Sequence, residues 1–162
     1  MKTADTVGKR SRPPAFTREC VLNEILAPTD FSSRSERAIT YAIELARRLG
    51  AHLTLMHAVP APYAIDYMLG RIPNGEWEEA LHQAEGKLDI ALRRARIGYG
   101  RVDALVRVGS DLHEEIAGAV REVRASLVVL STHGYKGWKR LLYGSDADEL
   151  LLKIPCPVIV IR

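Results

Sequence analysis

Three glycines and a group of cationic and aromatic side chains occupy residues 131–145, STHGYKGWKRLLYGS. Glycine lets backbone amides approach an anion closely, because no side chain stands in the way. Gly144 and Ser145 come where a helix is expected to begin, and a helix start presents unpaired N–H groups and a positive dipole end. The stretch therefore predicts a site for a phosphorylated ligand.

The other side chains of this stretch each have two interpretations. Ser145 either donates to a phosphate oxygen or serves as an ordinary helix N-cap, and Tyr135 and Trp138 either stack on a base or pack on the core. His133 is a candidate site residue because it lies beside Gly134 in the sequence. Three cations either neutralise phosphates or form a solvated surface: Lys136, Lys139 and Arg140.

A second group of candidate site residues follows the first apolar run, in APTDFS at residues 27–32. Pro28 fixes the direction of the chain, Thr29 offers a hydroxyl, and Asp30 is an acceptor only. Asp30 can accept a hydrogen bond from a ribose hydroxyl or a base amino group, or help to hold a divalent ion. The alternative is that Asp30 caps the helix or turn that follows.

Short apolar runs alternate with helical patterns along the chain. The runs predict strands at 25–27, 51–59, 101–108, 126–130 and 157–162. Apolar residues at three- and four-residue spacing predict helices at about 33–49, 77–95, 112–123 and 145–153. The first helix is expected to begin with a capping box of Ser33 and Glu36, and Asp111 and Glu114 form a second capping pair.

This order of elements predicts one doubly wound, parallel α/β sheet with right-handed crossovers. The unbroken run SLVVL is typical of a strand covered on both faces, whereas RVDALVRV alternates enough to suggest a sheet edge. Ligands bind such sheets outside the carboxyl ends of the strands, where the strand order reverses. Both groups of candidate residues follow strands, so we expect them to line one crevice.

Positive charge is concentrated at the amino terminus. Residues 1–19 carry five Lys or Arg and two Asp or Glu, five minus two or +3, which equals the +3 of the whole chain. Residues 20–162 are therefore neutral overall, and nucleic-acid binding is not expected. We interpret residues 1–19 as a disordered basic arm, without the apolar core of a signal peptide, and residues 20–162 as one domain.

Several patterns are absent from the sequence, and their absence limits the compartment and the kinds of catalysis that we expect. No apolar run is long enough to span a membrane, and Cys20 and Cys156 show no metal-ligand spacing, so reduced thiols in the cytoplasm are expected. The sequence has no P-loop, no Gly-x-Gly-x-x-Gly after the first strand and no nucleophile elbow. No base or nucleophile has an evident partner, and we therefore name no catalytic residue.

From about Glu24 to Arg162 the chain resembles the universal stress protein family. The resemblance is carried by ILAPTDFSSRSERAITYAIELARRLGAHLTLMHAV, VGSDLHEEI, STHGYKGWKRLLYGS and KIPCPVIVIR. It implies a five-stranded parallel sheet in the order 3-2-1-4-5 with helices on both faces, an adenine nucleotide alpha-hydrolase-like fold. It also implies a homodimer in which the last strand, Val158 to Arg162, pairs across the interface and protects an apolar edge.

One branch of that family binds ATP through the motif G-x-x-G-(nine residues)-G-[ST]. In this sequence Gly134, the nine residues 135–143, Gly144 and Ser145 match the motif, whereas Ser131 stands in place of its first glycine. The resemblance assigns the phosphates of the nucleotide to the matching glycines and serine. A serine at 131 adds a small side chain where the backbone of the family passes close to the ribose.

The resemblance assigns the rest of the nucleotide to other segments. Asp30 faces the ribose or a metal ion, Ala58 and Leu130 face the adenine, and Gly109 contributes backbone near the site. Asp146 stands where the family has an apolar residue after the Gly-Ser pair. Its carboxylate would either repel a polyanion or recruit a magnesium ion.

Three functions agree with these observations. The first is a cytoplasmic, homodimeric stress-response module that binds an adenine nucleotide, ATP with a divalent cation such as Mg²⁺, as a sensor or regulator. The second is a family member without nucleotide binding that acts through protein partners, which Ser131 and Asp146 favour. The third is a slow ATP hydrolase that uses the same loop, against which the lack of a paired base counts.

Overall fold

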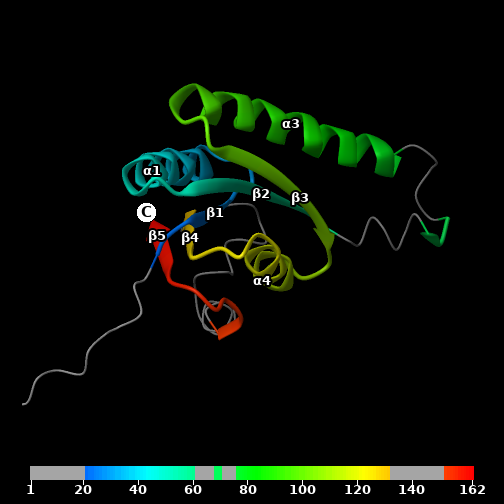
Figure 1. Ribbon diagram of the computed structural model, residues 1–162. Helices are drawn as coiled ribbons and strands as arrows, with labels where there is room; N and C mark the ends of the chain where they lie inside the picture. Colours follow the sequence, from blue (N-terminus) through cyan, green and yellow to red (C-terminus); the bar gives the residue numbers. More distant parts are fainter. Residues whose placement is uncertain (1–20, 61–67, 71–75, 132–151) are drawn as a thin grey trace, which may run out of the picture.

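The computed structural model describes residues 21–60, 68–70, 76–131 and 152–162. The basic arm expected at residues 1–19 lies outside the described residues, as does most of the glycine-rich stretch, residues 132–151. The described residues form a five-stranded sheet in the order β3-β2-β1-β4-β5, and every pair of neighbouring strands is parallel. The predicted fold class and strand order are confirmed (Figure 1).

Strand and helix positions follow the apolar patterns of the sequence closely. The strands are β1 (Glu24–Pro28), β2 (His52–Pro60), β3 (Val102–Gly109), β4 (Leu127–Ser131) and β5 (Val158–Ile161). The main helices are α1 (Ser33–Leu49), α3 (Glu76–Gly98) and α4 (Leu112–Val123). Every residue of β4 is buried, as its unbroken apolar run predicts, and β3 lies at an edge of the sheet. None of the described helices is long and apolar enough to cross a lipid bilayer.

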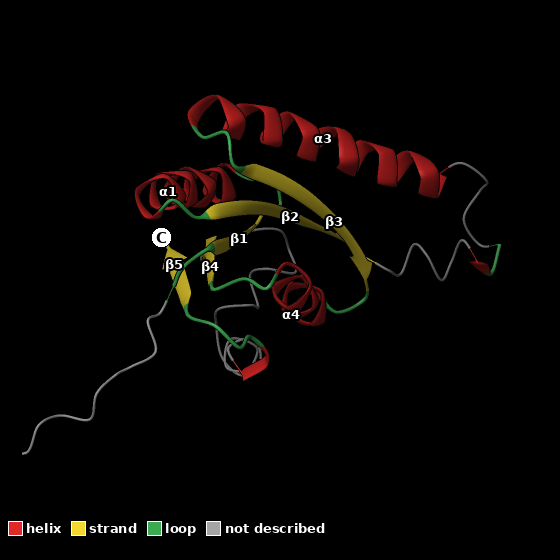
Figure 2. Ribbon diagram, viewed as in Figure 1, coloured by secondary structure: helices red, strands yellow, loops and turns green. Residues whose placement is uncertain are grey.

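Helices cover both faces of the sheet, with α1 and α3 on one face and α4 on the other (Figure 2). Successive residues of a strand point to opposite faces, so each strand contributes to two cores. The core under α1 and α3 includes Ile25, Ile39, Leu53, Leu88 and Val129. The core under α4 includes Leu26, Met56, Ile116, Val128 and Leu130.

The N-cap of helix α1 lies one residue earlier than the sequence suggested. Its N-cap is Ser32, whose hydroxyl accepts from Ser35 N–H at 3.2 Å. The predicted capping box of Ser33 and Glu36 is therefore wrong, because the third residue after the true cap is Ser35. The helix ends as expected at Gly50, whose left-handed backbone (φ 65°) directs its N–H to the carbonyl of Ala46.

The N-cap of α4 is the predicted Asp111, whereas the carboxylate of Glu114 pairs with a lysine. Asp111 is the N-cap and accepts from His113 N–H at 2.8 Å. The carboxylate of Glu114 lies 2.9 Å from Lys153 Nζ, and Lys153 is also 3.5 Å from Asp111. The short segment before β5 is thus tied by charge to the amino end of α4.

The strand order reverses at β1, which pairs with β2 on one side and β4 on the other. The chain passes from β1 through α1 to β2 and β3, and then returns through α4 to β4. The carboxyl ends of β1 and β4 are consequently neighbours at the point where the crossovers diverge. Ligand crevices in parallel α/β sheets form at this position.

Candidate functional site

Thr29 holds the chain in place as it leaves β1. Its N–H donates to the carbonyl of Met56 at 2.7 Å, which extends the pairing with β2. Its buried hydroxyl donates to Ser35 Oγ and accepts from Phe31 N–H, both at 3.0 Å. Thr29 therefore joins β1, the following turn and the first turn of α1 through one side chain.

Asp30 caps the turn between β1 and α1. Its Oδ1 accepts from the N–H of Ser32 at 3.1 Å and from the hydroxyl of Ser32 at 2.6 Å. Because Ser32 is also the N-cap of α1, the carboxylate lies near the positive end of the helix dipole, where negative charge is stabilised. The structure thus shows the capping interpretation of Asp30.

Phe31 and His57 form a second support under the same turn. Phe31 is in the left-handed region with φ 61°, which is unusual for a residue with a Cβ. Its ring packs on the imidazole of His57, with 4.3 Å between the ring centroids. Nδ1 of His57 lies 2.8 Å from the carbonyl oxygen of Thr29, and since a carbonyl only accepts, Nδ1 carries the proton.

Burial lowers the pKa of His57 below its usual value. The hydrogen bond to Thr29 and the charge of Asp30 raise the pKa, whereas the charge of Lys87 lowers it further. The desolvation of a charged imidazole is the largest of these effects. The folded protein therefore favours a neutral His57 that donates from Nδ1.

This pKa shift predicts that acid destabilises the fold through His57. Because the pKa of the folded state is below that of the unfolded state, protons bind preferentially to the unfolded chain, so the stabilisation is present above pH 6.5 and is lost as the pH falls below it. His57→Asn keeps a donor for the Thr29 carbonyl but does not titrate. The difference in unfolding free energy between wild type and this variant, measured in urea from pH 8 to pH 5, should fall below pH 6.5. A difference that stays constant across this range would contradict the prediction.

The two residues assigned to adenine lie on the α4 side of the sheet. Leu130 is fully buried in the core under α4, and Ala58 packs against that core. Ser131 is the last residue of β4, is buried, and pairs with Ile161 of β5. Because strand residues alternate, its side chain points to the opposite face from that of Leu130.

Gly109, at the end of β3, has room for no side chain. A Cβ at this position would lie 1.9 Å from Oε1 of Glu115. Glu115 is held there by Arg107, whose Nε lies 2.7 Å from its Oε2, and a second nitrogen of Arg107 lies 2.5 Å from Glu122 Oε2. The glycine lets the Arg107–Glu115 ion pair close over the end of β3.

We expect Gly109→Ala to destabilise the protein by about 1–2 kcal/mol, because Glu115 must leave Arg107 to make room for the methyl group. Glu115→Ala removes the obstacle. The double variant Gly109→Ala/Glu115→Ala should therefore unfold at nearly the same urea concentration as Glu115→Ala alone. If the loss in the double variant equals the sum of the losses in the two single variants, the contact with Glu115 is not the reason that a glycine is needed at position 109.

The structure brings part of the predicted site together. Pro28, Thr29 and Asp30 lie at the end of β1, and Leu130 and Ser131 lie at the end of the neighbouring β4. The remaining predicted residues lie outside the described part of the chain: His133, Gly134, Gly144, Ser145 and Asp146. Within the described residues, no three His, Cys, Asp or Glu side chains gather as a metal site would require.

Sequence reasoning did not give His57 or Phe31 a place at the site. No motif of the sequence includes His57, and its bond to the Thr29 carbonyl supports the backbone of the turn. The sequence does not indicate the conformation of Phe31, since a left-handed backbone is expected at Gly or Asn rather than at Phe. The available clue is their position: Phe31 lies shortly after the end of β1, and His57 lies near the end of the adjacent strand β2.

Comparison with known proteins agrees with this fold. The profile of the Universal stress protein family matches residues 22–162. The chain belongs to the universal stress protein family. A universal stress protein of Thermus aquaticus is 32% identical over 143 residues, which cover 85% of this chain and 97% of the relative.

Solved universal stress protein structures share the fold. The protein from Archaeoglobus fulgidus in complex with dAMP is 24% identical, with a TM-score of 0.63, and the match covers 88% of this chain and 99% of that one. A universal stress protein in complex with cAMP is 19% identical, with a TM-score of 0.64 and coverage of 88% and 98%. At these identities the likeness shows the fold of the family.

Proposed function

We propose that this universal stress protein binds an adenine nucleotide, with ATP as the main ligand, at the carboxyl ends of β1 and β4. The observation that carries the proposal is the convergence of Pro28, Thr29 and Asp30 with Leu130 and Ser131 where the strand order reverses. The dAMP and cAMP complexes of two structural relatives support the same ligand class.

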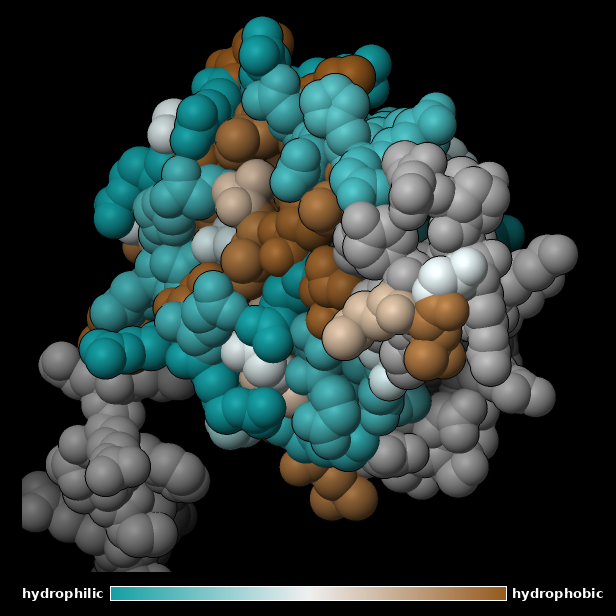
Figure 3. Space-filling view, turned by 90° about the vertical axis from the view of Figure 1, so that its right-hand side faces the viewer, coloured by the Kyte–Doolittle hydropathy of each residue, from teal (hydrophilic) through white to brown (hydrophobic). Residues whose placement is uncertain are grey.

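The base would lie against apolar groups on the α4 side of the crevice, beside Ala58 and Leu130. The face toward which β2 and β3 run has apolar side chains gathered in its middle, with hydrophilic ones around them (Figure 3). Asp30 would accept from a ribose hydroxyl. A carboxylate has about four acceptor positions, so the two bonds from Ser32 do not preclude a third.

The phosphates would lie against the motif Gly134 to Ser145, which follows β4 directly in the sequence. A magnesium ion would be held mainly by phosphate oxygens and water, with a single carboxylate from Asp30 or Asp146. The protein would supply one ligand to an ion that arrives with the nucleotide.

The proposed role is sensing or regulation in a stress response, with slow turnover at most. The imidazole of His57 lies against the turn that contains Asp30, and its Nδ1–H donates to the carbonyl of Thr29. Its geometry supports the turn and does not direct that nitrogen toward a ligand. The nucleotide would act by changing the stability of the crevice and of the loop that follows β4.

A melting experiment tests this function. The purified protein is heated with ATP, ADP, AMP and cAMP, each with and without Mg²⁺, and the same panel is run with GTP as a control for the base. A ligand at 100 times its Kd stabilises by about 2.7 kcal/mol, which raises the melting temperature by several degrees. No shift with any adenine nucleotide at millimolar concentration would sink the proposal, and the protein-partner alternative would then be favoured.

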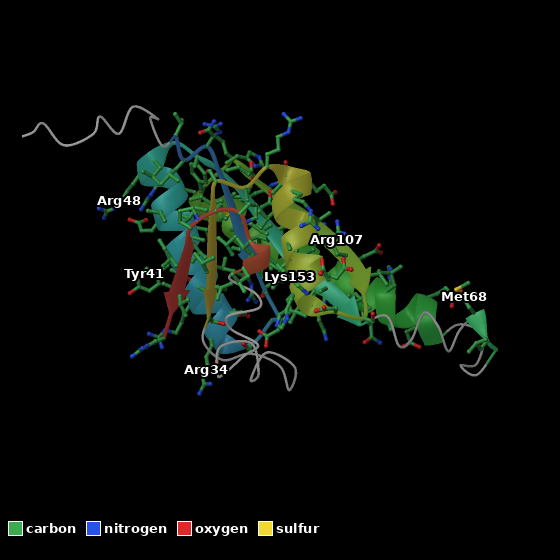
Figure 4. All side chains as sticks on the ribbon, turned by 90° about the horizontal axis from the view of Figure 1, so that it is seen from below. Arg34, Tyr41, Arg48, Met68, Arg107 and Lys153 are labelled. Carbon is green, nitrogen blue, oxygen red and sulfur yellow. The ribbon has the colours of Figure 1, made fainter. Side chains whose placement is uncertain are left out.

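A second candidate function, assembly through the edge of the sheet, is favoured by β5. Among the described residues β5 pairs only with β4, and Ile159 and Val160 remain 40% and 39% exposed. Figure 4 shows Arg34, Tyr41 and Arg48 along the outer side of α1, the helix that contacts β5. An apolar strand edge beside an exposed tyrosine is suited to pairing with a second copy of the chain, and we propose a homodimer through Val158 to Arg162.

A charged residue on this edge should give a monomer. Ile159→Lys places an ammonium group on the proposed interface, so light scattering coupled to size exclusion should show the mass of one chain instead of two. Leu152→Lys is the matched control, because Leu152 is 87% exposed and precedes the strand. A wild type that is already monomeric at micromolar concentration would contradict the dimer.

A further inference from the structure

A groove of about 390 Å³ runs between α1 and α3, on the face of the sheet opposite to Ala58 and Leu130. It begins near the end of β1 and follows the two helices. Its volume lies in the range of small-ligand pockets. Its main lining residues are Phe31, Ile39, Ile43, Lys87, Ile90 and Arg94.

The two ends of the groove differ in their surroundings. Near the carboxyl end of α3 the helices touch, since a Cβ on Gly98 would lie 3.6 Å from the side chain of Ile43. At the other end the lining includes Thr29 and Phe31, from the turn before α1. Arg94 reaches across to Glu36 at 3.6 Å, so an ion pair joins the two helices at the groove.

Apolar groups form the walls, and one of them is strongly exposed. Ile90 on α3 is 54% exposed, although it faces a groove whose opposite wall is formed by Ile39 and Ile43 of α1. Ala91 and Ala95 form the floor on the α3 side, and neither fills the space. The groove therefore leaves apolar surface in contact with water, which an apolar chain would cover.

A positive charge lies toward the end of the groove at Thr29 and Phe31. Lys87 lines the groove, and its charge acts on His57, which packs against Phe31 at this end. No carboxylate of the described residues forms an ion pair with Lys87, whereas Arg94 is already engaged with Glu36. The charge of Lys87 is thus suited to an anion.

We propose that this groove binds a single-chain amphiphile with an anionic head, a medium-chain carboxylate, whose head group pairs with Lys87 and whose chain lies between Ile39, Ile43 and Ile90. From Lys87 to Ala95 the helix rises by eight residues, about 12 Å, which sets the length of the chain. The ligand class follows from Lys87, which has no ion-pair partner among the described residues, beside an elongated apolar groove. This site shares only the Thr29 turn with the proposed nucleotide crevice and lies on the other face of the sheet.

Calorimetric titration of the full chain with hexanoate, octanoate, decanoate and decanol, all below micelle concentrations, tests the proposal. Each added methylene is expected to increase affinity two- to fourfold, near the transfer free energy of a buried CH₂. Decanoate should bind more tightly than decanol, because only the carboxylate pairs with Lys87. No saturable binding of decanoate, or affinities independent of chain length, would overturn the proposal.

Three variants locate the binding. Lys87→Gln should weaken decanoate about tenfold and leave decanol unchanged. Arg93→Gln is the matched control, because it removes a charge from the same helix at an exposed residue paired with Asp89 and outside the groove. Ala91→Phe fills the groove and should abolish binding of both ligands. Equal affinity in Lys87→Gln and Arg93→Gln would place the ligand elsewhere, and this surface pair decides the question even if Ala91→Phe does not fold.

Discussion

Thr29→Val should lower the free energy of unfolding by about 2 kcal/mol and weaken ATP binding at the same time. Valine has nearly the shape of threonine but removes the hydroxyl that donates to Ser35 and accepts from Phe31. The N–H of Phe31 then loses its partner in a backbone conformation that already has a positive φ. A polar group left unsatisfied at a part-buried site costs about 1–3 kcal/mol. Urea unfolding and ATP titration of the same preparation measure the two effects.

Thr29→Ser is the matched control for this prediction. Serine keeps the hydroxyl and removes only a buried methyl group, so the loss in stability should be about 1 kcal/mol and ATP affinity should be close to that of wild type. If valine and serine reduce ATP affinity equally, the hydroxyl does not position the Asp30 turn. If valine leaves both quantities unchanged, the hydrogen bonds of Thr29 contribute nothing measurable.

Gly144→Val is expected to reduce ATP affinity by at least tenfold without changing the melting temperature of the free protein. If the glycine-rich motif binds the phosphates as proposed, a valine side chain would keep its backbone amides away from them. The loss of two charge-assisted hydrogen bonds to the phosphates weakens the binding free energy by about 3 kcal/mol or more. ATP should therefore be affected more strongly than AMP, which has fewer phosphates to lose.

Gly137→Val is the control for this second prediction. Gly137 lies in the same stretch but occupies one of the nine variable positions of the motif, between Gly134 and Gly144. Its substitution should leave ATP affinity within about twofold of wild type, well under 1 kcal/mol. Equal losses at 137 and 144 would show that any added bulk in the stretch is harmful. No loss at 144 would mean that the phosphates bind elsewhere.

The fold could be predicted because each element carries its own signal. The apolar runs of β1 and β4 are read directly as buried strands, and the alternation of β3 indicates an edge, as the structure shows. The strand order itself came from the family resemblance, since periodicity does not specify which strands are neighbours. The helix caps were harder, because SSRSE contains three serines and only the folded turn selects Ser32 over its neighbour Ser33.

The site could be predicted only in part, because its geometry depends on contacts between distant residues. Asp30 was recognised as a possible cap, but its two bonds to Ser32 depend on the left-handed conformation of Phe31. His57 is 28 residues from Thr29 in sequence and meets it only through the pairing of β1 with β2. No local pattern indicates such a contact. The predictions for Ser145 and Asp146 stay predictions, since these residues lie outside the described part of the chain.

Calorimetric titration of the wild-type protein with ATP in the presence of Mg²⁺ tests the nucleotide site most directly. We predict saturable binding of one ATP per chain, with an affinity that Gly144→Val reduces by at least tenfold and Gly137→Val does not. GTP should bind more weakly, because the base is expected to contact the backbone and apolar groups around Ala58 and Leu130. The absence of saturable heat up to millimolar ATP, in protein shown to be folded by its melting curve, would contradict the account.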